Sequence, residues 1–162
     1  SDVAEVVSGI DLVGNEQFFD VDFYKPLFKQ WRNANKGLIA HVGESQSAEN
    51  VKYAIKSLHV NRISHGIKVA DDIDIMKLAN DHGIAFDVAL TSNIKTGVVA
   101  DLATHPIKKM IEHGCKVSLG TDDPAVLDTT LSDEYNIAYI DVGLSYDTIL
   151  QMKQNAINSA LL

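Results

Sequence analysis

The stretch "LIAHVGES" (residues 38–45) places three apolar residues before a histidine and a glutamate that are three positions apart. Such a run is typical of an interior strand that ends near Gly43, which puts His41 and Glu44 at the strand's exit. Catalytic groups of α/β proteins usually lie there. Taken alone, the pair fits two interpretations: a buried histidine beside a helix start, or a metal ligand with an acid next to it.

Similar strand-like runs recur along the chain and alternate with segments of helical periodicity. Helices are predicted after Ser47, from Pro106 to Gly114, and from near Ser145 toward the end of the chain. This β-α-β-α order indicates an α/β protein with a parallel sheet and crossover helices. The predicted strands lie within residues 6–14, 37–43, 61–66, 84–93 and 115–123.

A polar residue or a glycine closes each predicted strand, at steps of about 24 to 29 residues, roughly one βα unit. An open doubly wound sheet and a (β/α) barrel share this spacing, but no "GxGxxG" or "GxxxxGK[ST]" phosphate loop is present, so the barrel is favoured. Five strands are too few to close an eight-stranded barrel. Either the sheet is open or the chain is a piece of a barrel. The closing residues are Gly14, His41, His65, Asn93 and Asp122.

Composition bounds the partners and the chemistry. The apolar content is 46%, but no apolar run approaches the roughly 20 residues of a membrane span. The first residues lack a signal-peptide pattern. We therefore expect a cytoplasmic protein. The formal charge of −8 disfavours nucleic-acid and anionic-membrane partners. The single cysteine, Cys115, excludes an internal disulfide and an all-thiolate zinc site, and we expect it to be buried and inert.

Two further strand ends carry groups suited to chemistry. His65 precedes Gly66 in "RISHG" and lies one strand along from His41, close enough for both imidazoles to face one site. In "SLGTDDPAV" (118–126), Pro124 restricts Asp123 to extended backbone, so the carboxylates of Asp122 and Asp123 should diverge. A strand-to-helix turn with a capping aspartate explains the same residues equally well.

Other polar residues are given structural roles. We expect "TSN" (91–93) to shape the rim of the sheet through side-chain to backbone hydrogen bonds. The remaining histidines are predicted to be surface or capping residues away from the strand exits; they are His59, His82, His105 and His113.

Six motifs, in order and spacing, resemble the adenosine deaminase family of metallo-dependent hydrolases, and most closely its bacterial members. The resemblance covers nearly the whole chain. It implies a zinc-containing TIM (β/α)8 barrel that hydrolyses adenosine and 2′-deoxyadenosine to the inosine product and ammonia in purine salvage. The motifs are "IDLVGNE" (10–16), "HVGE" (41–44), "RISHG" (62–66), "LTSNIKTG" (90–97), "HPIKKM" (105–110) and "SLGTDDPAV" (118–126).

The resemblance also implies a role for each matching residue. His41 and Asp122 would be zinc ligands, Glu44 would donate a proton to purine N1, and His65 would orient or deprotonate the attacking water. Asp123 would bond purine N7 and the Gly14 backbone N–H would meet the N3 edge. Three positions depart mildly from the family motifs: Val42 replaces alanine, Ser64 replaces glycine and Gly120 replaces asparagine.

One family motif is absent. The family's first strand carries "HxH", two further zinc ligands, and no "HxH" occurs in this sequence. We therefore expect residues 1–162 to be the C-terminal portion of one barrel domain, strands four to eight, with an N-terminal part of the same enzyme as partner. Two ligands alone would hold zinc poorly. Two alternatives stay open: a deaminase of adenine or a modified nucleoside, and a noncatalytic half-barrel.

Overall fold

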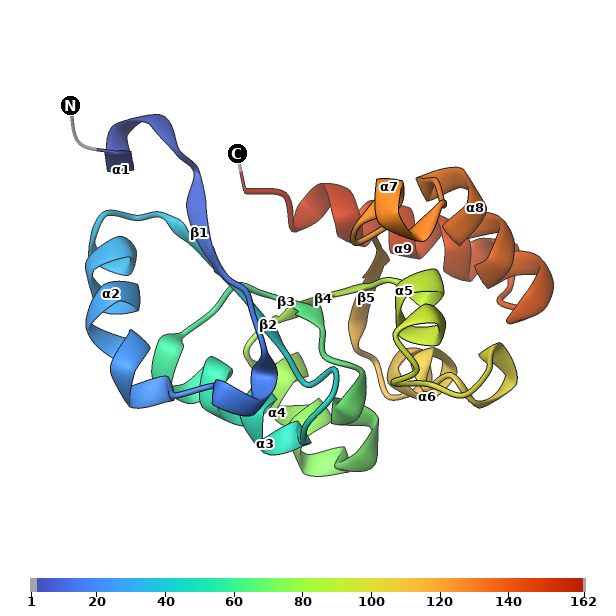
Figure 1. Cartoon of the computed structure of the whole chain (residues 1–162), viewed down its shortest axis with the longest axis horizontal. Helices are drawn as coiled ribbons and strands as arrows, with labels where there is room; N and C mark the ends of the chain where they lie inside the picture. Colours follow the sequence, from blue (N-terminus) through green and yellow to red (C-terminus); the bar gives the residue numbers. More distant parts are fainter. Residues whose placement is uncertain (1–2, 162) are drawn as a thin grey trace.

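The computed structural model describes residues 3–161, and its strands form one five-stranded parallel sheet in the order β1-β2-β3-β4-β5 (Figure 1). The strands are β1 (Gly9–Leu12), β2 (Gly37–Val42), β3 (Arg62–His65), β4 (Ala85–Val88) and β5 (Lys116–Leu119). A doubly wound sheet reverses its strand order at a switch point, whereas a barrel adds each strand beside the last. The strictly sequential order confirms the barrel-type arrangement predicted from the spacing.

Helices and short turns connect the strands. In Figure 1, α2, α3, α4 and α6 lie along one side of the sheet and α9 lies beside β5. The α-helices are α1 (Val3–Val6), α2 (Val21–Asn33), α3 (Ala48–Tyr53), α4 (Ile73–Asp81), α5 (Leu90–Lys95), α6 (Ile107–Glu112), α7 (Pro124–Leu127), α8 (Leu131–Asn136) and α9 (Tyr146–Asn158). The remaining turns are 3-10 or π-helical: η1 (Glu16–Phe18), η2 (Ala54–Leu58), η3 (Ile67–Asp71), η4 (Leu102–Thr104) and η5 (Ile137–Asp141).

Two neighbouring rows of side chains show how the sheet separates its core from its polar face. Ala40, Ile63, Phe86 and Val117 pair in register across four strands, and each is at most 1% exposed. Burying such side chains against the helices is the main driving force for the fold, at about 1.5–3 kcal/mol for each large one. The next row, on the opposite face because side chains alternate, is polar. It consists of His41, Ser64, Asp87 and Ser118.

The predicted helix starts are confirmed. Ser47 is the N-cap of α3, and α6 begins directly after Pro106. Gly114 follows α6 with φ of 81°, a left-handed conformation that glycine adopts without steric penalty. The last helix, α9, begins after Ser145, whose hydroxyl accepts a hydrogen bond from the Thr148 N–H at 3.1 Å.

The first, fourth and fifth strands are shorter than predicted. β1 covers only Gly9–Leu12, β4 ends at Val88 and β5 ends at Leu119. Gly14 and Asp122 therefore lie in the loops that follow their strands, and Asn93 lies in helix α5. After β4, a distant residue caps the start of α5: the buried carboxylate of Glu134 accepts hydrogen bonds from the N–H groups of Leu90 and Thr91 at 2.8 and 3.3 Å. These contacts satisfy the free N–H groups at a helix start.

Candidate active site

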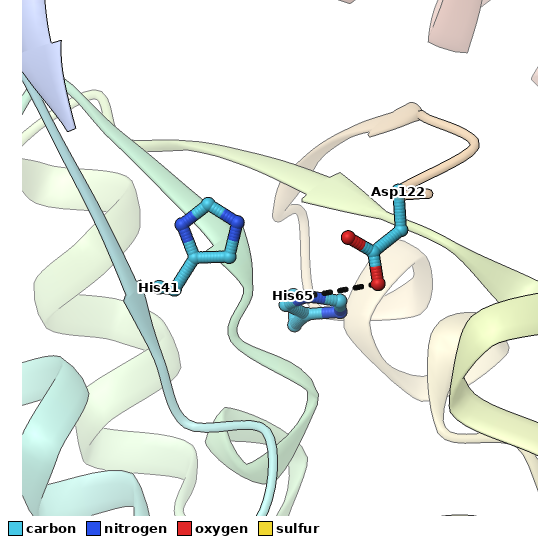
Figure 2. Close-up of side chains that lie close together, drawn as sticks. All are labelled: His41, His65 and Asp122. Carbon is cyan, nitrogen blue, oxygen red and sulfur yellow. Dashed lines mark ion pairs between the residues drawn. The ribbon is translucent and has the colours of Figure 1, made fainter. Parts of the chain in front are cut away.

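Three side chains meet at the carboxyl ends of the strands. His41 comes from β2, His65 ends β3, and Asp122 lies in the loop after β5 (Figure 2). One possible ligand atom from each lies within 4.8 Å of the other two. Two imidazoles and a carboxylate are donors that Zn²⁺ takes in proteins, so the chemistry of this set fits zinc. The sequence predicted the convergence of His41 and His65 on one edge, and the structure confirms it.

His65 and Asp122 both have a left-handed backbone conformation, which sets the direction of their side chains. His65 is paired in register with Val42, which faces the apolar side, yet the centroids of the His65 and His41 rings are only 5.5 Å apart. The φ of His65 is 62°, and that of Asp122 is 55°. Non-glycine residues in this region cost on the order of 1 kcal/mol and persist where the surrounding structure holds them. Here the left-handed turn directs His65 away from the strand alternation and into the site.

A carboxylate on β1 holds the ring of His41. The Nδ1 atom of His41 lies 3.1 Å from Asp11 Oδ1. Burial lowers the pKa of His41, but Asp11, together with the carboxylates of Asp122 and Glu44, outweighs it and raises the pKa above 6.5. A proton held on Nδ1 leaves Nε2 free to bind a metal, as in carboxylate–histidine–metal arrangements. Sequence reasoning missed Asp11, although a charged residue inside an apolar strand was a visible signal.

The loop that carries Glu44 is built around Glu16. The Glu16 carboxylate accepts hydrogen bonds from the backbone N–H groups of residues 43–46 and from Asn50 Nδ2, the last at 3.0 Å. Burial raises the pKa of Glu16, but the hydrogen bonds, led by that of Asn50, outweigh it and lower the pKa below 4.5. A buried anion therefore fixes the turn in which Glu44 stands.

The "TSN" segment contacts the site directly, which corrects its predicted role as a backbone-shaping rim. Asn93 Nδ2 lies 3.2 Å from Glu44 Oε1 and 3.2 Å from His65 Nδ1. The Ser92 hydroxyl donates to Asp122 Oδ2 at 2.6 Å. Sequence reasoning missed both contacts because it placed these residues at the end of a strand, whereas helix α5 turns their side chains toward the site.

His105 also departs from its predicted surface position. It is 5% exposed, and its Nε2 lies 3.2 Å from Asn93 Oδ1. The capping part of the prediction is confirmed, because His105 Nδ1 accepts a hydrogen bond from the Ile107 N–H at the start of α6. His82 and His113 bond the carbonyls of Leu78 and Lys109, four residues earlier, away from the site.

The other predicted residues lie at the margins of the cluster. Gly14, with φ of 133°, lines a hollow of about 200 Å³ that also includes His41, Phe18 and Phe19. Asp123 precedes Pro124 with φ of −96° and ψ of 80°, outside the set of possible metal ligands that His41, His65 and Asp122 form.

Two remaining expectations concern chemistry and membranes. Cys115 is buried as predicted, and burial raises the pKa of its thiol to about 11, so the reactive thiolate is not populated near neutral pH. Within residues 3–161, no helix has the length and apolar character that a membrane span requires.

Solved structures with the same fold define the class. An adenine deaminase from Arthrobacter aurescens superposes with a TM-score of 0.91 at 28% identity, over 96% of this chain and 48% of that one. An amidohydrolase from Burkholderia ambifaria with bound Zn gives 0.89 at 27% identity, over 96% and 44%. An N6-methyl-AMP deaminase from Arabidopsis thaliana gives 0.84 at 26% identity, over 96% and 45%. The chain is thus part of a (β/α) barrel of the amidohydrolase type, as predicted.

The sequence comparisons are more specific. The profile of the family described as "Adenosine deaminase" matches residues 3–162. The adenosine deaminase of Klebsiella pneumoniae subsp. pneumoniae is 38% identical over 158 residues, which are 98% of this chain and 47% of that protein. This chain belongs to the adenosine deaminase family. It spans about half the length of the curated relatives that it matches.

Proposed function

We propose that this chain is part of an enzyme that hydrolyses the 6-amino group of adenosine and 2′-deoxyadenosine, with zinc, in cytoplasmic purine salvage. The observation that carries the proposal is the meeting of His41, His65 and Asp122 within 4.8 Å, beside a Glu44 carboxylate that is held by Asn93. Membership of the adenosine deaminase family supports the same reaction class.

His41 and Asp122 would hold the metal. Zinc, when bound, lowers the pKa of a coordinated water toward about 7 and so makes a nucleophile available at neutral pH. Catalytic zinc sites in proteins usually have three protein ligands or more, so two would bind zinc weakly. We therefore propose that a preceding segment with an "HxH" pair, on the N-terminal strands of the same barrel, completes the site. The bound Zn in the Burkholderia ambifaria amidohydrolase supports this choice of metal.

Glu44 and His65 would move and place the protons. Water adds through its oxygen to purine C6 while Glu44 delivers a proton to N1, which withdraws electron density from C6, and the first water proton replaces the one that Glu44 gives up. The bond from C6 to the amino nitrogen then breaks, and the second water proton leaves with ammonia. His65 lies 3.9 Å from Asp122 through its Nε2 atom, which supports its role in orienting the attacking water.

Gly14 and Asp123 would hold the purine. The Gly14 N–H would meet N3, and its position in the same hollow as His41 supports this role. Purine N7 can only accept a hydrogen bond, so Asp123, which directly follows the proposed ligand Asp122, would donate to it from a carboxyl O–H.

The test requires a polypeptide that includes the proposed N-terminal strands. We expect about one zinc per complete site and conversion of adenosine to inosine, followed by ultraviolet absorbance. His41→Ala should lose the zinc, whereas His113→Ala, at a histidine outside the site, should retain both zinc and turnover. Absence of zinc and of turnover in such material would contradict the proposal and would favour a noncatalytic half-barrel.

Adenine or an N6-modified adenine nucleotide is the second candidate substrate class. The adenine deaminase of Arthrobacter aurescens and the N6-methyl-AMP deaminase of Arabidopsis thaliana superpose well on this chain, which favours it. The residues assigned above would contact the metal, the attacking water or the purine, and none of them would hold ribose. Relative kcat/KM values for adenosine, adenine and N6-methyl-AMP separate the two candidates, and a preference for adenosine supports the first.

A further inference from the structure

The amide of Asn93 lies between two residues of the proposed reaction. Its Nδ2 atom is 3.2 Å from Glu44 Oε1 and 3.2 Å from His65 Nδ1. Asn93 is fully buried and His65 is 3% exposed, so water does not compete for the bond between them. A carboxamide nitrogen has two hydrogens, one for each partner. This assignment depends on which way the amide points, which the neighbouring contacts decide.

His105 fixes the orientation of that amide. The backbone N–H of Ile107 can only donate, and it lies 3.2 Å from His105 Nδ1, so Nδ1 is the acceptor. Burial lowers the pKa of His105 to about 4, and the neutral ring therefore carries its proton on Nε2. That Nε2–H points at the Asn93 side-chain oxygen at 3.2 Å. The nitrogen of the amide must then face Glu44 and His65.

The orientation of the Asn93 amide determines which ring nitrogen of neutral His65 carries the proton. Because Asn93 donates to Nδ1 of His65, that atom is an acceptor, and the neutral ring keeps its proton on Nε2. The alternative, a proton on Nδ1 donated to Glu44, meets a separation of 3.6 Å, which is too long for a hydrogen bond. The Nε2 atom faces Asp122 Oδ2 at 3.9 Å.

We propose that Asn93, oriented by His105, is a positioning residue that holds His65 in the Nε2–H tautomer. A protonated Nε2 cannot bind a metal, so the hydrogen bond from Asn93 keeps His65 out of the ligand set formed by His41 and Asp122. The Nε2–H group of His65 is instead a hydrogen-bond donor to the reacting water. The use of that donor in catalysis rests on the proposed function, whereas the tautomer itself follows from the hydrogen bonds alone.

Nuclear magnetic resonance can determine the tautomer of His65 in the absence of metal and substrate. The ring nitrogens of His65 in the 15N-labelled, metal-free chain are observed through long-range couplings to the ring carbon-bound protons, at a pH where His65 is neutral. The His65→Gln variant identifies its signals. Protonated and unprotonated nitrogens have well separated shifts. We expect protonated Nε2 and unprotonated Nδ1.

Asn93→Asp is the discriminating variant, because a carboxylate can accept but cannot donate. It should move the proton of His65 to Nδ1, or protonate both nitrogens. Asn93→Ala should shift the ratio of the two tautomers by about fivefold to tenfold, the effect of losing one hydrogen bond. Thr91→Val is the matched control on the same helix, since the Thr91 hydroxyl has no hydrogen-bond partner within the described part of the chain. It should leave the His65 signals unchanged.

The possible results test the tautomer of His65 and its catalytic role separately. An Nδ1–H tautomer in the unmodified chain, or a His65 spectrum that Asn93→Asp leaves unchanged in a folded chain, would overturn the inference. In the polypeptide that includes the N-terminal strands, Asn93→Ala should lower kcat for adenosine at least tenfold with zinc content unchanged. Full turnover together with an altered tautomer would count against the catalytic role of His65 in the proposed function and leave the tautomer assignment intact.

Discussion

The carboxylate of Glu16 accepts a hydrogen bond from the backbone N–H of Glu44, at 3.1 Å and across 28 residues of sequence. The N–H groups of Gly43, Ser45 and Gln46 bond the same carboxylate. One buried anion thus satisfies four consecutive backbone donors, and the loop cannot rearrange without leaving them unpaired. The position of the proposed proton donor is therefore set from another strand's loop.

Glu16→Gln should destabilise the chain by about 2–4 kcal/mol, because hydrogen bonds to a charged acceptor are stronger than those to a neutral amide and one amide hydrogen would face donors. Urea unfolding followed by circular dichroism measures the loss. Glu49→Gln is the control: Glu49 is a partly exposed residue paired with Lys52 within one helix turn, and its change should stay within about 0.5 kcal/mol. Equal effects of the two substitutions would show that the Glu16 bonds contribute little.

The contribution of Glu16 to the free energy of unfolding should also depend on pH, and it should decrease in acid. Its pKa in the folded chain is lowered below 4.5. A lowered folded pKa means that the stabilisation is fully present above the unfolded value and is lost as the pH falls through the folded one. The difference in unfolding free energy between the unmodified chain and Glu16→Gln should therefore be constant near neutral pH and shrink in acid. A difference that grows on acidification would contradict this assignment.

The parts of the site that could be predicted from the sequence are those set by strand periodicity. His41 and His65 each end an apolar run of a parallel sheet, so their convergence on one edge follows from the β-α order. Asp122 follows the last strand in the same way. These are local signals, repeated once per βα unit.

The parts that could not be predicted depend on contacts between distant residues. Glu134 caps α5 from 44 residues away, and this bond converts the end of a predicted strand into a helix that carries Asn93. Glu16 reaches the Glu44 loop in the same manner. No periodicity in the sequence encodes either pairing, because each is fixed only when the strands have assembled.

Glu134→Ala should destabilise the chain by about 2–4 kcal/mol, since it leaves the buried N–H groups of Leu90 and Thr91 without partners. It should also loosen α5, so amide hydrogen exchange at Ser92 and Asn93 should accelerate more than exchange in α9. Asp133→Ala, at an exposed capping residue of the same helix α8, is the comparison and should leave α5 protected. Unchanged exchange in α5 would show that Glu134 does not hold this helix.

Asp11→Asn should weaken zinc binding by roughly 10–100-fold in the polypeptide that includes the proposed N-terminal strands, the usual effect of losing the carboxylate behind a histidine ligand. Its carboxylate lies 3.1 Å from His41 Nδ1. Zinc affinity is measured by competition with a chromophoric chelator. Asp123→Ala removes a carboxyl group at the same edge that is not in the ligand cluster, and it should raise KM for adenosine without changing zinc affinity. Equal zinc affinities in both variants would remove Asp11 from the proposed site.

Glu44→Gln in the same polypeptide should keep its zinc and lose kcat by about 10²–10⁴-fold, because it removes a proton donor and no ligand. The isosteric amide still accepts a hydrogen bond from Asn93, which lies 3.2 Å away, so the loop geometry should survive. Zinc content by elemental analysis and adenosine conversion by ultraviolet absorbance give the two readouts. Near-normal conversion would exclude Glu44 as the group that protonates purine N1, whereas loss of zinc together with activity would place its carboxylate among the ligands.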